Sequence, residues 1–257
     1  MEFLQSTFTP LVFVFTVSNL AAMGLQVSLP EVMAALKNRV AIVLIFVWGW
    51  ILGPALGYLI TLLLPLEEPY KIVILLASLA PCAPFLQQMV GKASGDISFA
   101  GALIPLVAVG TVILMPVMAP FLIKGLTINA MALAKPLLLT ILLPLLIGAA
   151  IRHYYGTTAT RVYPAVKVLA KLSTLLTVLW CLILFGKDML NTAGQFALMA
   201  MTLFMVGMAL VTYLIGFGMR QNQRSVMALG MGTRNVAAVL AAALAIPDAD
   251  PRILVMT

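Results

Sequence analysis

Residues 70–90 read YKIVILLASLAPCAPFLQQMV, an apolar stretch that Pro81 and Pro84 interrupt near its middle. Each proline removes a backbone N–H donor and clashes with the preceding turn of a helix. The pair therefore predicts that the helix unwinds locally. Carbonyl groups freed within a membrane survive only where they line a cavity or pack on protein. A proline kink packed on a neighbouring helix is the simpler interpretation. For this stretch alone, the kinked helix and the unwound helix are equally well supported.

A second apolar stretch, residues 225–246, is interrupted by Gly, Thr, Arg and Asn at 230–235. The two stretches belong to a faint internal repeat, because GYLI at 57–60 and TYLI at 212–215 each precede one of the interruptions. The two stretches are the third and the eighth of the predicted helices, an odd offset of five, so the two halves enter the membrane from opposite sides. Inverted repeats with a broken helix in matching positions indicate the substrate site of a transporter.

The composition requires lipid as the solvent. Of the 257 residues, 63% are apolar and only 9% are charged, whereas soluble domains carry about 25% charged residues. Spanning helices need about 20 apolar residues and barrel strands only about 10, so the long apolar runs predict helices. Eight stretches are long enough: Phe8–Ser28, Val40–Leu64, Tyr70–Val90, Ile97–Ile123, Ala130–Ile151, Val166–Gly186, Ala193–Met219 and Ser225–Ile246.

Lysine and arginine residues set the expected orientation. Counted on alternate sides of the membrane, nine of them lie on one side and five on the other, and the richer side is expected to be cytoplasmic. We therefore expect a multi-pass protein of a bacterial inner membrane with its N-terminus outside. The sequence has no basic run with interleaved aromatic residues, so its net charge of +7 does not indicate nucleic acid as a partner.

Arg234 is the one charged residue well inside a predicted span. At the bilayer centre such a charge costs at least about 2.5 kcal/mol, and intramembrane ionisable residues usually face a cavity or a partner. Its five donors suit a carboxylate or another oxyanion, which favours Arg234 as the binding group for an anionic substrate. The alternatives are a cation that neutralises helix C-terminal carbonyls, and a side chain that snorkels to the membrane surface.

The other expected site residues are polar groups near the two interruptions. The residues expected to contact the substrate beside Arg234 are Asn235, Thr233, Gln87, Gln88 and Asn19. For Asn19, a hydrogen bond to a neighbouring helix is the simpler role. The helix breaks are assigned to Pro81, Pro84, Gly230 and Gly232. The sequence shows no paired acid and base or activated nucleophile, no phosphate loop and no zinc spacing, so we expect neither an enzyme nor a metal or cofactor site.

Three short motifs carry a resemblance. They are Met23-Gly24-Leu25 ahead of a basic link, the proline-rich third stretch ending in Gly95-Asp96, and Thr233-Arg234-Asn235 ahead of an Ala/Leu-rich half-helix. In these motifs the chain resembles the bile acid:sodium symporter (BASS) family, within the bile/arsenite/riboflavin transporter superfamily. The resemblance implies an all-α integral membrane protein with an inverted-repeat transporter fold, in which a panel domain moves against a core that holds two broken crossing helices.

The resemblance also implies a division of the chain. Residues 1–123 would form the first repeat with its crossing helix at about 70–90, and residues 124–164 a connecting helix and cytoplasmic loop. Residues 165–257 would form the second repeat, with its crossing helix at about 225–246. The first helix of the family is expected to be absent and the last to be incomplete, since an apolar run only begins near Pro251.

Departures from the family pattern concern the residues that bind the coupling sodium ion. Sodium-coupled members carry Ser-Asn in the first crossing helix, where this chain has Leu86 and Gln87, and a Glu where it has Gly230. A Gln usually precedes the Asn of the second crossing helix, and here that residue is Arg234. The usual sodium ligands therefore look replaced. Our hypothesis is that the guanidinium takes the electrostatic role of a bound sodium ion.

Two transport functions follow from the resemblance. The leading one is secondary active transport of a small organic anion by alternating access, with sodium coupling in doubt. The alternative is an arsenite or antimonite efflux permease, because those permeases resemble this chain in Ala80-Pro81-Cys82 followed by Gly95-Asp96, and the soft sulfur of Cys82 suits a soft metalloid. Ala237 and Ala238 stand where such permeases carry an acidic residue. A small buried apolar role for Cys82 is the favoured interpretation.

Overall fold

The structure is a computed structural model that describes residues 2–84, 86–123, 130–193, 196–247 and 250–256. Every regular element within these ranges is helical, as the sequence predicts. The elements are α1 (Glu2–Gly24), α2 (Leu29–Lys37), α3 (Arg39–Phe46), η1 (Val47–Leu52), α4 (Gly53–Leu63), α5 (Glu68–Ser78), α6 (Leu86–Lys92), α7 (Ile97–Leu122), α8 (Ala130–Leu137), η2 (Leu138–Leu142), α9 (Leu143–Tyr154), α10 (Gly156–Ala193), α11 (Ala197–Leu214), α12 (Gln221–Gly232), α13 (Val236–Leu244) and α14 (Pro251–Met256).

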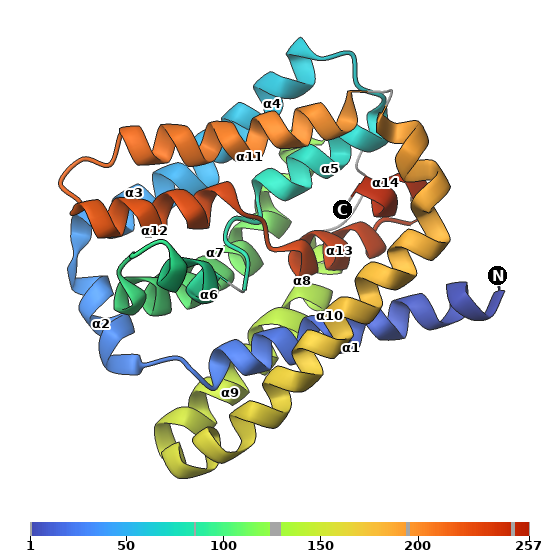
Figure 1. Cartoon of the computed structure of the whole chain (residues 1–257). Coiled ribbons are helices and arrows are strands. Elements are labelled where there is room, and N and C mark those ends of the chain that lie inside the picture. The colour runs from blue at the N-terminus through green and yellow to red at the C-terminus, as the bar shows by residue number, and fades with distance from the viewer. Residues whose placement is uncertain (1, 85, 124–129, 194–195, 248–249, 257) are drawn as a thin grey trace.

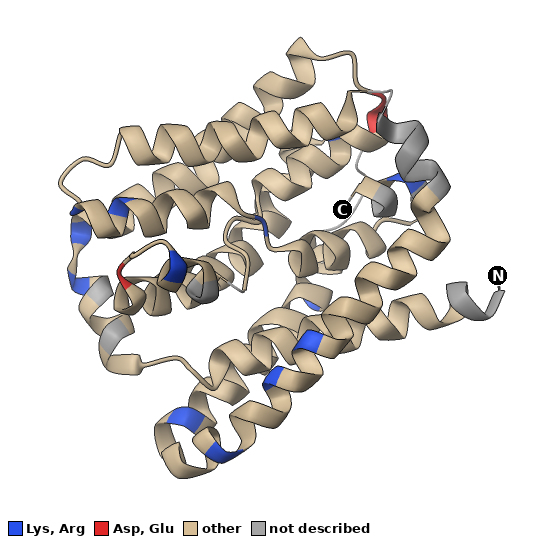
Figure 2. Ribbon diagram, in the orientation of Figure 1, with Lys and Arg blue, Asp and Glu red and all other residues tan. Residues whose placement is uncertain are grey.

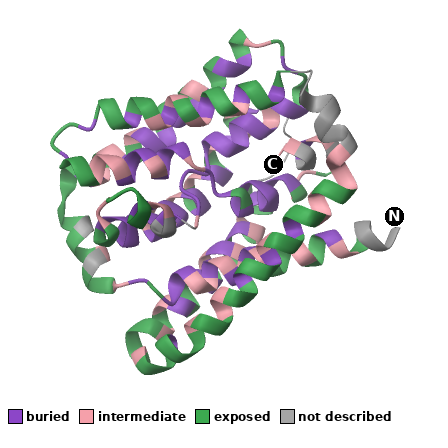
Figure 3. Ribbon diagram, in the orientation of Figure 1, coloured by how far each residue is buried: buried purple, intermediate pink, exposed green. Residues whose placement is uncertain are grey.

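Long helices account for six of the eight predicted spans. Within the described residues, the helices long and apolar enough to cross a membrane are Ser6–Gly24, Arg39–Leu63, Ile97–Leu122, Ala130–Tyr154, Gly156–Gly186 and Ala197–Leu214. The other two predicted spans are broken, one into α5 and α6 and the other into α12 and α13. Large apolar residues such as Phe121, 85% exposed, face outward rather than into the core, and Figure 3 shows exposed positions in green along the outer helices. The chain is therefore a multi-pass integral membrane protein.

The predicted start of the sixth span is wrong. Helix α10 begins at Gly156 rather than at Val166, so Tyr155 alone separates it from α9 and no loop extends to residue 164. The helix begins before its apolar part because polar residues outside the lipid can form the same backbone hydrogen bonds of an α-helix. The basic link expected after Met23-Gly24-Leu25 holds a further short helix, α2.

The helices pack as a small layer and a larger body (Figure 1). Helix α1 packs along both α9 and α10, and we refer to these three as the α1/α9/α10 layer. Its helices approach closely because Gly24 and Gly148 face each other: a Cβ on Gly148 would lie 2.7 Å from the carbonyl oxygen of Ala21 and 2.8 Å from the backbone nitrogen of Leu25. Small residues of this kind allow close helix contact within a membrane.

The larger body holds both broken helices. In it α4 and α11 pack on α5, α7 packs on α6, and α11 packs along α12. Trp50, in the π-helical turn η1, is buried, covers Gly110 of α7, and donates from Nε1 to the carbonyl of Leu79 at 3.3 Å. Leu79 is the C-cap residue directly after α5, so this tryptophan supports the start of the first break.

Candidate transport site at the helix crossing

The two breaks meet in the centre of the larger body (Figure 1). The link after α5 and the link after α12 run antiparallel and form an isolated β-bridge between Pro81 and Arg234. The N–H of Cys82 donates to the carbonyls of Gly230 and Thr233, at 2.9 Å each, and the N–H of Asn235 donates to the carbonyl of Ala80 at 2.9 Å. Each broken helix therefore supplies hydrogen-bond partners for backbone groups of the other, and lipid could not supply them.

Side chains add further hydrogen bonds at the crossing. The hydroxyl of Thr233 accepts a hydrogen bond from the N–H of Ala83 at 3.2 Å, and donates to the carbonyl of Leu229. The side chain of Asn235 accepts from the N–H of Ala238 at 3.2 Å and caps the start of α13. Two predicted site residues thus have well-defined structural roles in joining and capping the broken helices.

Thr233→Val should lower the free energy of unfolding by about 1–3 kcal/mol, because valine keeps the shape but leaves the Ala83 N–H unpaired in a buried position. Thr212→Val is the matched control. Thr212 is also buried and also donates to the carbonyl four residues earlier, that of Met208, but its hydroxyl accepts no hydrogen bond from another segment among the described residues. Thermal unfolding in detergent measures both, and equal melting temperatures for the two variants would contradict this role of Thr233.

Arg234 is buried, with 6% of its surface exposed. Its Nη1 donates to the carbonyl of Ala77 at 3.4 Å, its Nη2 donates to the carbonyl of Met231, and its guanidinium carbon lies 4.5 Å from the centre of the Phe204 ring. Its Nε has no partner among the described residues. A cavity of about 160 Å³ borders the side chain and is lined mainly by Val, Ala and Met side chains. These contacts match the interpretation in which the cation neutralises helix C-terminal carbonyls.

The residues assigned to the breaks divide into two groups. Pro81 and Pro84 lie in the irregular link, as predicted. Gly230 and Gly232 do not break the helix, because α12 continues through both and ends at Gly232. Their small size serves packing instead: a Cβ on Gly230 would lie 3.0 Å from Leu103, and one on Gly232 would lie 2.7 Å from Ala209. The break follows them, at Thr233 to Asn235.

The first broken helix also contains three other residues considered in the sequence analysis, Gln87, Gln88 and Cys82. Gln87 and Gln88 belong to α6, but their side chains lie outside the described residues. Cys82 is 3% exposed and has a left-handed backbone with φ of 71°. Its thiol faces Gly230, so it is enclosed by the packing of the crossing.

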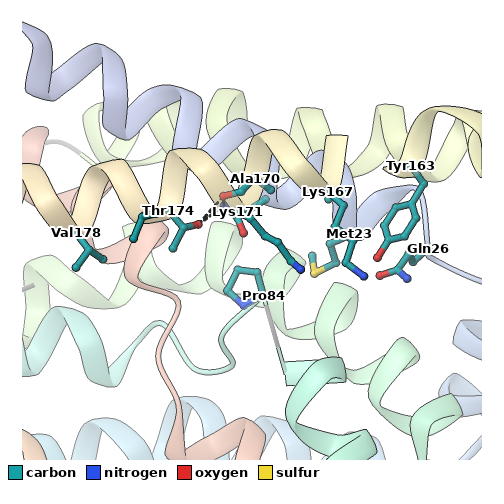
Figure 4. Close-up of a pocket in the computed structure, with 12 residues that line it drawn as sticks. Met23, Gln26, Pro84, Tyr163, Lys167, Ala170, Lys171, Thr174 and Val178 are labelled. Atoms are coloured by element: carbon teal, nitrogen blue, oxygen red, sulfur yellow. Dashed lines mark hydrogen bonds between the residues drawn. The ribbon is translucent and has the colours of Figure 1, made fainter. Parts of the chain in front are cut away.

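A larger cavity, about 380 Å³, lies between the α1/α9/α10 layer and the crossing. Figure 4 shows that it is bounded by α10 on one side and by Pro84 of the first link on the other. Met23 of α1 and Gln26 of the link after it close one end, and apolar groups such as Val178 line the other. Asn19 borders it and also donates to Thr174 at 3.2 Å and to Phe15 at 2.8 Å, so the predicted helix–helix role and a place at the cavity occur together.

Two lysines of α10 point into this cavity, which sequence reasoning missed (Figure 4). Lys167 lies with its amine 5.4 Å from the ring centre of Tyr163, and Lys171 is one turn further along. Both were counted as orientation signals, since lysine at a helix end commonly marks the cytoplasmic side. The available signal was the spacing: Tyr163, Lys167, Lys171 and Thr174 are three or four apart and share one helix face.

The charge around the cavity is of one sign. Its lining includes both amines and contains no Asp or Glu. Figure 2 shows lysine and arginine along the left and lower edges of the molecule, with few acidic residues anywhere in the described part of the chain. Within the described residues no group of three His, Cys, Asp or Glu is placed to hold a metal ion.

These features define a class of protein. Broken helices that meet inside a multi-pass membrane bundle, beside a cavity between two packed layers, are the architecture of secondary transporters. The sequence profile of the Sodium Bile acid symporter family matches residues 12–192, and the chain belongs to this family. The family prediction is therefore confirmed, and the protein is a secondary transporter rather than an enzyme. No curated protein matches the chain.

Proposed function

We propose that this transporter carries a small organic anion, bound between Lys167, Lys171 and the helix crossing. The cavity with two amines and no acidic lining residue is the observation that carries the proposal. Its volume of about 380 Å³ falls in the range of small-molecule sites, roughly 300–1,000 Å³. Amines act as point charges for carboxylates and phosphates, and the uncompensated pair favours an anion over a cation.

The other lining groups support an organic rather than an inorganic anion. Asn19, Gln26 and Thr174 offer hydrogen bonds on one part of the wall, while Met23 and Val178 offer apolar surface on another. A ligand with a charged head and an apolar body fits such a mixed lining. Inorganic oxyanions would leave the apolar wall without a partner.

The place of the cavity supports alternating access. Ten of its twelve lining residues belong to α1 and α10, Gln26 lies in the link after α1, and Pro84 belongs to the crossing. We take the α1/α9/α10 layer as the panel and the larger body as the core. A shift of one against the other changes which side of the membrane the cavity faces, as rigid-body rocking does in other secondary transporters.

A thermal-shift screen of purified protein against organic anions identifies the ligand, and Lys167→Gln and Lys171→Gln then test the site. Each substitution should weaken binding of that anion by about tenfold or more, the loss of one charge-assisted contact. The melting temperature without ligand should remain near that of the unsubstituted protein, because neither amine forms a salt bridge among the described residues.

Lys135→Gln is the matched control, since Lys135 is exposed on α8 and does not line the cavity. It should leave both binding and uptake into proteoliposomes unchanged. If the two cavity variants bind and transport the anion as well as Lys135→Gln does, the proposed site is wrong.

The arsenite alternative gains no support from the contacts. Trivalent arsenic prefers several soft thiolates, but Cys82 is enclosed in the crossing and the other cysteine, Cys181, lies on α10 outside it. A single buried thiol suits the packing role that the sequence favours. Organic anion transport is therefore the function that the geometry supports better.

A further inference from the structure

Arg234 joins the C-terminal ends of two broken helices. Its guanidinium donates to the carbonyl of Ala77 in the last turn of α5 and to that of Met231 in the last turn of α12. A helix C-terminus carries about −0.5 elementary charge. Two such ends together present about one unit of negative charge, and one guanidinium matches it.

The guanidinium has no acidic partner in the described structure. The salt bridges found there involve Lys71 and Arg252 only. The sequence contains no Asp or Glu at all in 69–95 or 221–247, the stretches that form the crossing. Helix-end carbonyls and the face of Phe204 are therefore the groups that offset the buried charge of Arg234.

Sodium, which the family name implies, does not fit beside this side chain. In transporters with broken helices, unwound carbonyls and half-helix C-terminal ends coordinate sodium. Here the carbonyls of Ala77 and Met231 accept from Arg234, and those of Gly230 and Thr233 accept from the Cys82 N–H. A second cation would compete for these oxygens next to a fixed positive charge, and among the described residues no carboxylate is paired with Arg234 to offset it.

We propose that Arg234 is a resident cation, which bridges the two helix ends where a coupling cation would otherwise do so, and that transport consequently needs no sodium. The part about transport rests on the proposed function, whereas the part about bridging the helices does not. Arg234 acts here as a positioning residue. Direct contact with substrate, which the sequence also suggests, would use its free Nε and the neighbouring small cavity.

The first test uses the unsubstituted protein. Its melting temperature should be the same in sodium chloride and in choline chloride at equal ionic strength. Uptake of the anion found by the screen should also be the same in both salts. Selective stabilisation by sodium overturns the proposal even if no transported anion is known, so this result is independent of the proposed function.

The second test removes the cation. Arg234→Gln should lower the melting temperature by about 5–10 °C, the shift expected from losing two charged hydrogen bonds in a chain of this size, and should reduce the maximal uptake rate about tenfold. Arg234→Lys keeps the charge and should recover part of both losses. Arg224→Gln, on α12 with its Nε bonded to the carbonyl of Met219, should behave like the unsubstituted protein.

The outcomes separate the two roles of Arg234. A raised KM with an unchanged melting temperature would show a substrate contact and overturn the resident-cation role. Should Arg234→Gln fail to fold, Arg234→Lys decides: recovery of stability supports the proposal, and a loss equal to that of Arg234→Gln contradicts it. If the lysine variants leave anion transport intact while the Arg234 results are as expected, only the proposed anion site fails.

Discussion

Gly148→Leu is expected to prevent recovery of folded protein. A Cβ at this position would lie 2.7 Å from the carbonyl oxygen of Ala21 and 2.8 Å from the nitrogen of Leu25, both backbone atoms of the α1 region. Overpacking typically costs about 1–3 kcal/mol and occasionally more. Here a backbone cannot move aside as a side chain can, so we expect the upper end of that range or beyond. Size-exclusion chromatography and thermal unfolding in detergent measure the effect.

Gly186→Leu is the matched control. Gly186 is also a helix residue, on α10, but among the described residues no atom beyond its own helical backbone lies within 4 Å of the position its Cβ would take. Leucine has a better helix propensity than glycine, so this variant should be at least as stable as the unsubstituted protein. If both leucine variants elute and melt alike, α1 and α9 do not pack as described.

The second large effect is expected from Gly110→Val. A Cβ on Gly110 would lie 2.7 Å from Cζ2 of Trp50, whose ring is rigid and only 4% exposed. The valine must displace the indole, which then loses its hydrogen bond to the carbonyl of Leu79. We expect a loss of about 3 kcal/mol or more, from overpacking together with an unpaired buried carbonyl. Uptake should fall too, because Leu79 begins the first break.

Gly207→Val separates this effect from a general intolerance of valine. At Gly207, on α11, the nearest atom to an added Cβ is a methyl of Leu56 at 3.3 Å, and a flexible side chain can give way. Its melting temperature should change little. Retention of full stability and uptake by Gly110→Val would show that Trp50 does not support the crossing.

Membrane insertion and the helical breaks were predictable from sequence because they depend on local properties. A 63% apolar chain with 9% charge needs lipid whatever its tertiary contacts, and the prolines at 81 and 84 disrupt a helix through their own covalent geometry. The glycines at 230 and 232 were misjudged for the converse reason. Glycine lowers helix propensity without forbidding a helix, and close neighbours decide whether it is a break or a packing site.

The sequence indicated which residue types form the site, but not which groups each of them contacts. Arg234 stood out as a buried charge, yet the sequence left open whether it faces substrate, water or carbonyls. The lysines of α10 were visible as charges and were assigned to topology, since nothing local distinguishes a lysine at the membrane surface from one turned into a cavity. Pro84, which borders the same cavity, lies far from them in the chain.

By itself, then, the sequence determined that this is a helical membrane protein with two interrupted spans, because hydropathy and proline chemistry act over a few residues. Only the tertiary structure decided that the two interruptions pair with each other, that Arg234 bridges the ends of α5 and α12, and that Lys167 and Lys171 border a cavity beside them. Those relations join residues about 80 to 160 positions apart. They depend on how helices pack, since in a membrane each unwound carbonyl and each buried charge must find its partner within the protein.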